Sequence, residues 1–235
     1  MLDYDEEANR YDATRGGEPR ARAAADAVLA LVPENAHTLL DLACGTGIVT
    51  RHLTREGLRP FGVDRAAAML RGAAPRLSGA VCQADVRRLP FADDTFDAVS
   101  AVWLLHLLPD AAPVVAEAAR VLRPGGVFVT TVDKAAAHLG GSDICALVAP
   151  HGRRRLADAT ARITQLAAEH GLHPHGSAGF TGHGQGRVPA KLAREVRAGR
   201  IYPKGGEDLA AHLEALPNQQ TARPDPVYTV LAFSA

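Results

Sequence analysis

The sequence predicts an α/β protein with a doubly wound, mostly parallel sheet. Short apolar runs alternate with helical patterns through five successive units over residues 37–132. Such alternation requires parallel strands joined by crossover helices that cover both faces of one sheet. The 235 residues suffice for one substantial core, and 47% hydrophobic with 22% charged residues is an ordinary globular composition. We therefore expect residues 1–235 to form a single domain.

The first elements follow from local periodicity. Residues 18–32 have apolar side chains at helical spacing and predict a helix. The segment TLLDLACGTGIVTRHLTREG predicts a strand, a tight turn at Gly45 and Gly47, and a helix that ends at Gly57. The sequence that follows predicts a strand in RPFGVD, a helix in AAAMLRGAA, a strand in AVCQAD and a strand over about residues 96–102.

The second half begins with a turn that contains Trp103 and His106. A helix in VVAEAARVL, a turn at RPGG and a fifth strand in VFVTTV come next. Beyond this strand the pattern predicts three helices and a last strand, at residues 154–170, 189–199, 207–216 and VYTVLAFSA. The Gly- and His-rich segment 170–186 predicts a loop, and residues 184–224 predict a helical insertion over the sheet.

Charge and cysteine content exclude several classes of function. The chain has 26 basic and 26 acidic residues, so it lacks the positive excess typical of nucleic-acid binders. No run approaches the roughly 18 apolar residues that span a bilayer, and the acidic N-terminus is unlike a signal peptide, so we expect a cytoplasmic protein. Cys44, Cys82 and Cys145 are odd in number and far apart, which argues against a disulfide framework and a zinc knuckle.

A histidine-rich segment could instead hold a metal ion, because imidazole is a common ligand of zinc, copper and nickel. Its members are His170, His173, His175 and His183. Their spacing is irregular and no acidic or cysteine ligand accompanies them, so we expect no metal site. The basic run over residues 153–155 predicts a solvated helix end, with a site for an acidic substrate group as the alternative.

The ends of the predicted strands carry the candidate binding residues. Ligands of a doubly wound sheet bind beyond the carboxyl ends of the strands, so Gly45, Asp64, Asp85 and the segment after Ala101 should converge there. Glycines in the turn let the backbone approach a ligand and present free N–H groups. Asp64 could accept both hydroxyls of a ribose, and Asp85 could bind the amino group of a purine.

Two nucleotide classes compete for this crevice. A dinucleotide enzyme requires a third glycine near the pyrophosphate, and this chain has Ile48, Val49 and Thr50 there. A carboxylate near the mouth, Asp41, would repel pyrophosphate and suit an ammonium or sulfonium group. An NAD(P)-dependent oxidoreductase remains the alternative, because the strand–turn–helix pattern and Asp64 fit it as well.

Four motifs taken together are more specific: LLDLACGTGIVTRHL, FGVD, QADVRRLPFADDTFDAV and RVLRPGGVFV. In order and spacing they resemble class I S-adenosylmethionine-dependent methyltransferases, in the subgroup of ubiquinone/menaquinone-type enzymes and small-molecule methyltransferases of bacterial secondary metabolism. The resemblance implies a Rossmann-like sheet of seven strands whose last strand is antiparallel, a place that VYTVLAFSA would fill. It also implies S-adenosyl-L-methionine as the cofactor and methyl transfer, of the EC 2.1.1 class, to a small-molecule acceptor.

The resemblance further implies which residues contact the cofactor. The methionine moiety would lie against the turn and the fourth strand, at Ala43, Cys44, Gly45, Gly47, Ala101 and Val102. Asp64 would bind the ribose hydroxyls, and the adenine would be bordered by Arg65, Met69, Asp85 and Val86. In the N-terminal arm, residues 1–17, YDATRGG resembles a Tyr-x-x-x-Arg element, so Tyr11 and Arg15 would cover the sulfonium and hold the carboxylate.

His106 is the candidate catalytic residue. In related enzymes this position lies near the transferring methyl group, so the resemblance implies either a general base or a residue that positions the cofactor. The arm, the segment after the fifth strand and the cap insertion 184–224 would determine the acceptor. A cofactor-binding partner protein without catalysis is a second alternative, and homodimerisation through the arm or the cap remains open.

Overall fold

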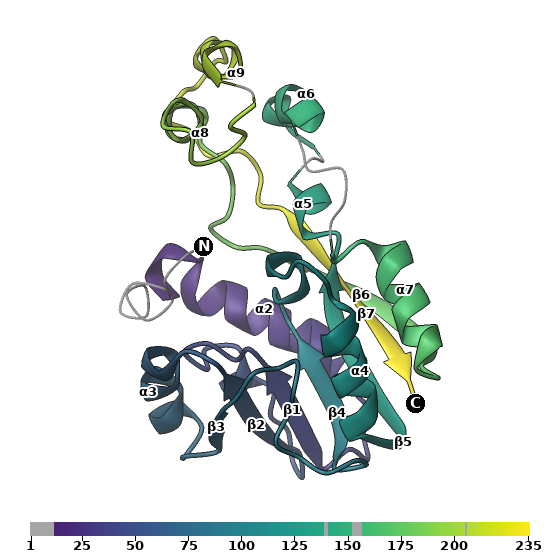
Figure 1. Ribbon diagram of the computed structural model, residues 1–235. Coiled ribbons are helices and arrows are strands. Elements are labelled where there is room, and N and C mark those ends of the chain that lie inside the picture. Colours follow the sequence, from purple (N-terminus) through teal and green to yellow (C-terminus); the bar gives the residue numbers. More distant parts are fainter. Residues whose placement is uncertain (1–11, 139–140, 152–156, 205) are drawn as a thin grey trace.

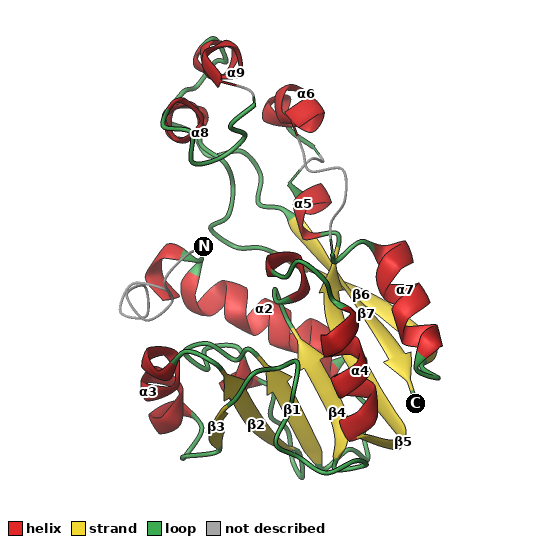
Figure 2. Cartoon of the chain, in the orientation of Figure 1, coloured by secondary structure: helices red, strands yellow, loops and turns green. Residues whose placement is uncertain are grey.

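The structure, a computed structural model, describes residues 12–138, 141–151, 157–204 and 206–235 (Figures 1 and 2). Within these ranges seven strands form one sheet in the order β3-β2-β1-β4-β5-β7-β6. Their bounds are β1 Thr38–Leu42, β2 Arg59–Asp64, β3 Val81–Gln83, β4 Phe96–Ala101, β5 Leu122–Val132, β6 His173–Thr181 and β7 Val227–Ser234. The strands β1 to β5 pair in parallel, and β7 is antiparallel to both β5 and β6. The doubly wound sheet with its antiparallel last strand is therefore confirmed.

Helices cover both faces of this sheet (Figure 2). α2 packs on one face, α4 and α7 pack on the other, and α3 lies beside β2 and β3. Their bounds are α2 Gly17–Leu29, α3 Ala67–Arg76, α4 Ala112–Val121 and α7 Thr160–Glu169. No helix in the described part of the chain is long and apolar enough to cross a membrane.

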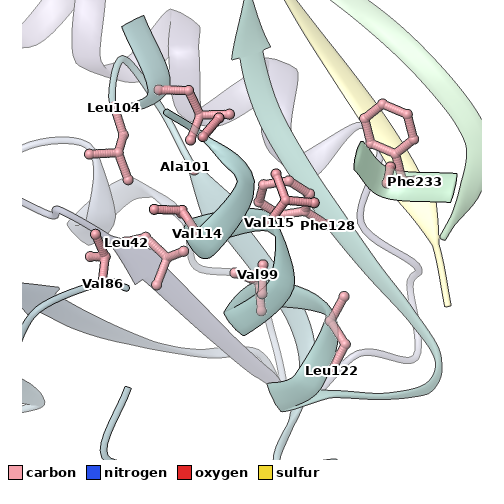
Figure 3. Close-up of a cluster of buried hydrophobic side chains, with 14 of the residues drawn as sticks. Leu42, Val86, Val99, Ala101, Leu104, Val114, Val115, Leu122, Phe128 and Phe233 are labelled. Carbon is pink, nitrogen blue, oxygen red and sulfur yellow. The ribbon is translucent and has the colours of Figure 1, made fainter. Parts of the chain in front are cut away.

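The core divides between the two faces because strand side chains alternate. Leu40, Val99 and Phe128 belong to the hydrophobic cluster on the face covered by α4 and α7. Figure 3 shows Val99 and Phe128 in this cluster. Their neighbours Leu39 and Ala98 point to the opposite face, where they pack with α2. Both faces of the central strands are thus apolar, which explains why these strands read as continuous hydrophobic runs in the sequence.

A helical cap stands beyond the carboxyl ends of the parallel strands (Figure 1). It consists of α6 Asp143–Val148, α8 Pro189–Arg197 and α9 Gly206–Glu214, which share a small apolar core of their own. Ile144, Leu192 and Leu213 are fully or nearly fully buried in that core. The short α5, Lys134–Ala137, follows β5 directly and leads the chain toward the cap. The cap therefore takes α6 in addition to helices from the predicted insertion 184–224.

Two predicted elements differ from the structure. The helix expected between Gly47 and Gly57 is reduced to one 3₁₀ turn, η1 Thr50–His52, because the Thr50 hydroxyl donates to the buried carboxylate of Asp41 and the chain turns away at Leu53. The loop expected over residues 170–186 contains β6, an edge strand that pairs with β7 along its whole length. A register shift beside Pro174 accommodates the missing N–H of that residue.

Smaller corrections concern strand boundaries. β3 ends at Gln83, so Asp85 lies two residues beyond the strand it was expected to end. The predicted RPGG turn lies within β5, where a register shift between Phe96 and Ala98 absorbs the extra residues and Gly125 has a φ of 79°. The basic run at residues 153–155 and the start of the helix predicted at residue 154 lie outside the described residues.

Candidate functional site

The turn after β1 is shaped by three residues with left-handed backbone conformations. Ala43, Gly45 and Gly47 have φ values of 56°, 57° and 72°. A Cβ atom on Gly45 would meet nothing within 4 Å, so the backbone there faces open space. A Cβ atom on Gly47 would lie 3.1 Å from the Cβ of Ala73 in α3. Gly45 therefore leaves room for a ligand, whereas Gly47 permits close packing.

Asp64 joins this turn to the end of β2. Its Oδ2 accepts a hydrogen bond from the Gly45 amide at 2.9 Å, and its Oδ1 accepts one from the Ala66 amide at 2.8 Å. Burial raises the pKa of Asp64, and these backbone donors oppose that effect. Each carboxylate oxygen keeps one lone pair for a hydroxyl donor. The structure thus brings together Gly45 and Asp64, two of the residues expected to converge at this edge of the sheet.

Asp41 is buried and does not lie at the mouth of the site, contrary to the sequence-based expectation. It is 3% exposed, and it accepts hydrogen bonds from the hydroxyls of Thr50 at 2.5 Å and Ser100 at 2.7 Å. Burial raises its pKa to about 6. Burial likewise raises the pKa of the neighbouring Cys44 thiol. Asp41 therefore ties β1 to β4 and η1 and does not set the charge that a ligand meets.

The described part of the N-terminal arm is docked on the glycine turn. Asp12 accepts a hydrogen bond from the Thr46 hydroxyl at 2.6 Å and forms a salt bridge with Arg76 at 2.7 Å. Arg76 also donates to the Thr46 carbonyl at 2.9 Å. Arg15 lies in the same region, in the lining of an opening bordered by Trp103. Tyr11 lies outside the described residues, and the sequence analysis did not single out Asp12.

The residues expected around an adenine differ in how exposed they are. Arg65 is exposed, whereas Met69 is 1% exposed and lies in the interior, so its side chain does not border an open site. Val86 is also buried, within the core beneath α4. Arg87 donates to both carboxylate oxygens of Asp85, and these hydrogen bonds lower the pKa of Asp85 to about 2. Asp85 would have to share its carboxylate with Arg87 to bind a ligand.

The end of β4 presents backbone and aromatic groups to the same edge. Ala101 is fully buried and its carbonyl accepts the Thr130 hydroxyl at 2.9 Å, while Val102 is half-buried. Trp103 has a φ of 56°, and its amide donates to the Thr131 hydroxyl at 2.7 Å. The guanidinium of Arg20 lies 3.7 Å from the centre of the Trp103 ring.

His106 lies in the short turn η2, Leu105–Leu107, directly after this segment. Its Nδ1 is buried and has no hydrogen-bond partner among the described residues. Burial, followed by the positive charges of Lys134, Arg15 and Arg20, lowers the pKa of His106 to about 3. The imidazole is therefore neutral at physiological pH.

Lys134 and His138 complete the edge from the side of α5. Burial, followed by the charges of Arg20 and Arg15, lowers the pKa of Lys134 to about 8. The Tyr228 hydroxyl and His138 Nε2 are 2.9 Å apart. Sequence reasoning missed Lys134, His138 and Tyr228 because no local motif marks them. In the described ranges, no group of three or more His, Cys, Asp or Glu side chains is placed to hold a metal ion.

Part of the chain is similar in sequence to known methyltransferases. Residues 40–130 match the family model described as "Methyltransferase domain". The demethylmenaquinone methyltransferase of Mycolicibacterium paratuberculosis is 37% identical over 131 residues, which cover 54% of this chain and 56% of the relative. That of Thermobifida fusca is 37% identical over 137 residues, covering 54% and 57%. The chain thus spans little more than half the length of these curated relatives.

Solved structures share the fold across most of the chain. The [4+2]-cyclase SpnF has a TM-score of 0.63 at 20% identity, with 98% of this chain and 93% of that chain covered. Geranyl diphosphate C-methyltransferase from Streptomyces coelicolor has a TM-score of 0.55 at 19% identity, covering 90% and 75%. The match over residues 40–130 and the shared fold make this chain similar to class I S-adenosylmethionine-dependent methyltransferases. S-adenosylmethionine is the cofactor of that class.

Proposed function

We propose that this protein transfers a methyl group from S-adenosylmethionine to a small-molecule acceptor between the sheet edge and the cap. The observation that carries this proposal is the hydrogen bond between the Gly45 amide and Asp64 Oδ2, at 2.9 Å. This bond holds the turn, with open space beside Gly45, next to a carboxylate whose remaining lone pairs can accept two ribose hydroxyls. When bound, the cofactor supplies an electrophilic methyl group on a sulfonium.

The described residues suit that cofactor in three places. Asp64 accepts the ribose hydroxyls, Gly45 allows close approach to the backbone, and Arg15 provides a cation for the carboxylate of the methionine moiety. Asp12 holds the arm against the turn and thereby holds Arg15 over the site. Because a sulfonium is a good leaving group, the chain contributes mainly approach and orientation.

In this proposal His106 accepts a hydrogen bond that the methyl acceptor donates. Its imidazole is neutral and its Nδ1 has no partner within the described ranges. A base with so low a pKa is weak, so His106 orients a hydroxyl or amine of the methyl acceptor more than it removes a proton.

A dinucleotide is less well supported than S-adenosylmethionine. Dinucleotide sites place the pyrophosphate at the N-terminus of a helix that begins in the glycine turn. Here the turn leads only into η1, of three residues, and the third glycine is missing. The fold alone does not determine which reaction is catalysed, since a cyclase shares this fold.

In this proposal the cap side of the site determines which methyl acceptor is bound. The matched relatives are named for demethylmenaquinone, and a ring of that kind is one candidate, but the family match ends at residue 130. The cap and α5 lie beyond it. A role in bacterial secondary metabolism, a cytoplasmic location and homodimerisation remain predictions from the sequence.

The test is titration of S-adenosylhomocysteine into the Asp64→Ala variant. Loss of the ribose hydrogen bonds should weaken binding by roughly 1 to 3 kcal/mol, about 5- to 150-fold. Asp208→Ala is the matched control, because Asp208 is exposed on α9 in the cap. Unchanged affinity in Asp64→Ala would contradict the assignment.

A further inference from the structure

The indole N–H of Trp103 is a buried donor without an acceptor. Its Nε1 atom is buried and has no hydrogen-bond partner among the residues that the structure describes. An indole N–H can only donate a hydrogen bond. Buried donors of this kind are rare in folded proteins, because removing an N–H group from water without a new hydrogen bond costs free energy. The group is thus placed for an acceptor that the described part of the chain does not supply.

The side chain of Trp103 is held in place from several sides. Its backbone has a left-handed φ of 56°, and its amide donates to the Thr131 hydroxyl at 2.7 Å. The guanidinium carbon of Arg20 lies over the ring, 3.7 Å from its centroid. Phe180 and Tyr228 contact the indole edge-to-face, with ring centroids 5.5 and 5.6 Å away. Because the ring cannot turn without breaking these contacts, the direction of its N–H is fixed.

Trp103 lines an opening that also reaches the arm and the glycine turn. Arg15 lines this opening from the arm. Ile48 and Val49 line it from the other side, and they directly follow Gly47 in the chain. One opening therefore brings Trp103 together with residues of the arm and of the cofactor turn, at the edge where the proposed cofactor binds.

The carboxylate that lines this opening is already engaged. Asp12 accepts a hydrogen bond from the Thr46 hydroxyl at 2.6 Å and forms a salt bridge with Arg76 at 2.7 Å. Among the described residues, no other acidic side chain lines the opening. An acceptor for the Trp103 N–H is therefore expected from a ligand.

We propose that Trp103 Nε1 donates a hydrogen bond to the carboxylate of the methionine moiety of S-adenosylmethionine. This inference rests on the proposed function, in which Arg15 provides a cation for the same carboxylate. A carboxylate has two oxygens, so one can face the guanidinium while the other accepts from the indole. Because the N–H can only donate, it binds the carboxylate and not the ammonium at that end of the cofactor. The fixed ring also loses little conformational freedom when the ligand binds.

The test compares two ligands that differ at this end. S-adenosylhomocysteine carries the carboxylate, whereas methylthioadenosine has the same nucleoside and a thioether but no amino acid end. Both are titrated by calorimetry into the wild type and into Trp103→Phe, which keeps an aromatic ring and lacks the N–H. In Trp103→Phe the affinity for S-adenosylhomocysteine should fall about tenfold, while the affinity for methylthioadenosine should change less than about twofold.

Two further proteins separate the hydrogen bond from the packing of the ring. Phe180→Leu alters the packing against Trp103 and leaves the indole N–H, so it should change the two affinities by the same factor. Trp103 is the one tryptophan of the sequence, so replacing tryptophan by benzothienylalanine during expression changes this position alone. That residue keeps the shape of the ring and has sulfur in place of the N–H, and it should show the same loss of about tenfold.

The outcomes separate this inference from the proposed function. Binding of methylthioadenosine tests the nucleoside site without the carboxylate, and it reports folding in each variant. Equal weakening of both ligands in Trp103→Phe, or an unchanged affinity of the benzothienylalanine protein for S-adenosylhomocysteine, would overturn the inference and leave the proposed function intact. If the wild type binds neither ligand, the proposed function and the inference are both wrong.

Discussion

The amide of Gly45 donates to Asp64 Oδ2 at 2.9 Å, and this contact makes the turn after β1 and the end of β2 one structural unit. The turn is supported from below by α3, since Gly47 packs against Ala73. It is covered from above by the arm, through Asp12 and Thr46. Predictions for each layer follow from these contacts.

Gly47→Ala should destabilise the fold by two separate effects. The added methyl group would lie 3.1 Å from the Cβ of Ala73, at a φ of 72°. Gly79→Ala is the control, because Gly79 has a φ of 81° and a Cβ there meets nothing within 4 Å. Urea denaturation should show a loss of about 1 kcal/mol for Gly79→Ala from backbone strain alone. Gly47→Ala should lose about 2 to 3 kcal/mol because overpacking is added. Equal losses would exclude the packing role of Gly47.

Asp12→Asn should loosen the arm with little effect on global stability. The substitution removes the salt bridge to Arg76 and weakens the hydrogen bond with Thr46. Affinity for S-adenosylhomocysteine should fall about three- to tenfold, because the arm must be ordered when the ligand binds. Asp26→Asn, exposed on α2, is the control for lost negative charge. If calorimetry finds the two variants equal, the arm does not hold the cofactor.

Asp41→Asn should change how stability depends on pH. The pKa of Asp41 is raised to about 6 in the folded state from an ordinary value of 3.8, so its protonated form is favoured by folding. The stability it contributes is full below pH 3.8 and is lost as the pH rises through about 6. Between pH 4 and 7 the wild type should lose up to about 3 kcal/mol relative to Asp41→Asn. The free energy of unfolding of both proteins is measured by denaturant titration at each pH. If it changes with pH equally in the two, Asp41 does not have the raised pKa of a buried carboxylate.

His106→Ala should affect turnover more than cofactor binding. The Nδ1 of His106 has no hydrogen-bond partner among the described residues, so the substitution breaks no hydrogen bond of that atom. With an acceptor present, kcat should fall at least about tenfold while the affinity for S-adenosylhomocysteine changes less than about twofold. Equal losses in both quantities would assign His106 to positioning the cofactor.

Much of the cofactor half could be predicted from the sequence because its signals are local. The strand β1, the glycine turn and the end of β2 at Asp64 follow one another in order, and apolar runs fix each strand. The contact between Thr46 and Asp12 joins residues 34 positions apart and has no motif. Such contacts depend on how the chain returns to the turn, which periodicity does not encode.

The remaining errors have physical causes as well. β6 was missed because residues such as His173 and Ser177 are polar and exposed, and their strand form is imposed by pairing with β7. Asp41 was placed at the mouth because its burial arises from Ser100, a residue of a neighbouring strand. The Tyr228 hydroxyl and His138 come together only through the tertiary fold.

Calorimetric titration of the wild-type protein with S-adenosylhomocysteine, NAD and NADP in parallel tests the proposed cofactor. Binding of S-adenosylhomocysteine at one site per chain, with no binding of either dinucleotide, is the predicted result. Binding of NAD or NADP without binding of S-adenosylhomocysteine would contradict the proposed function.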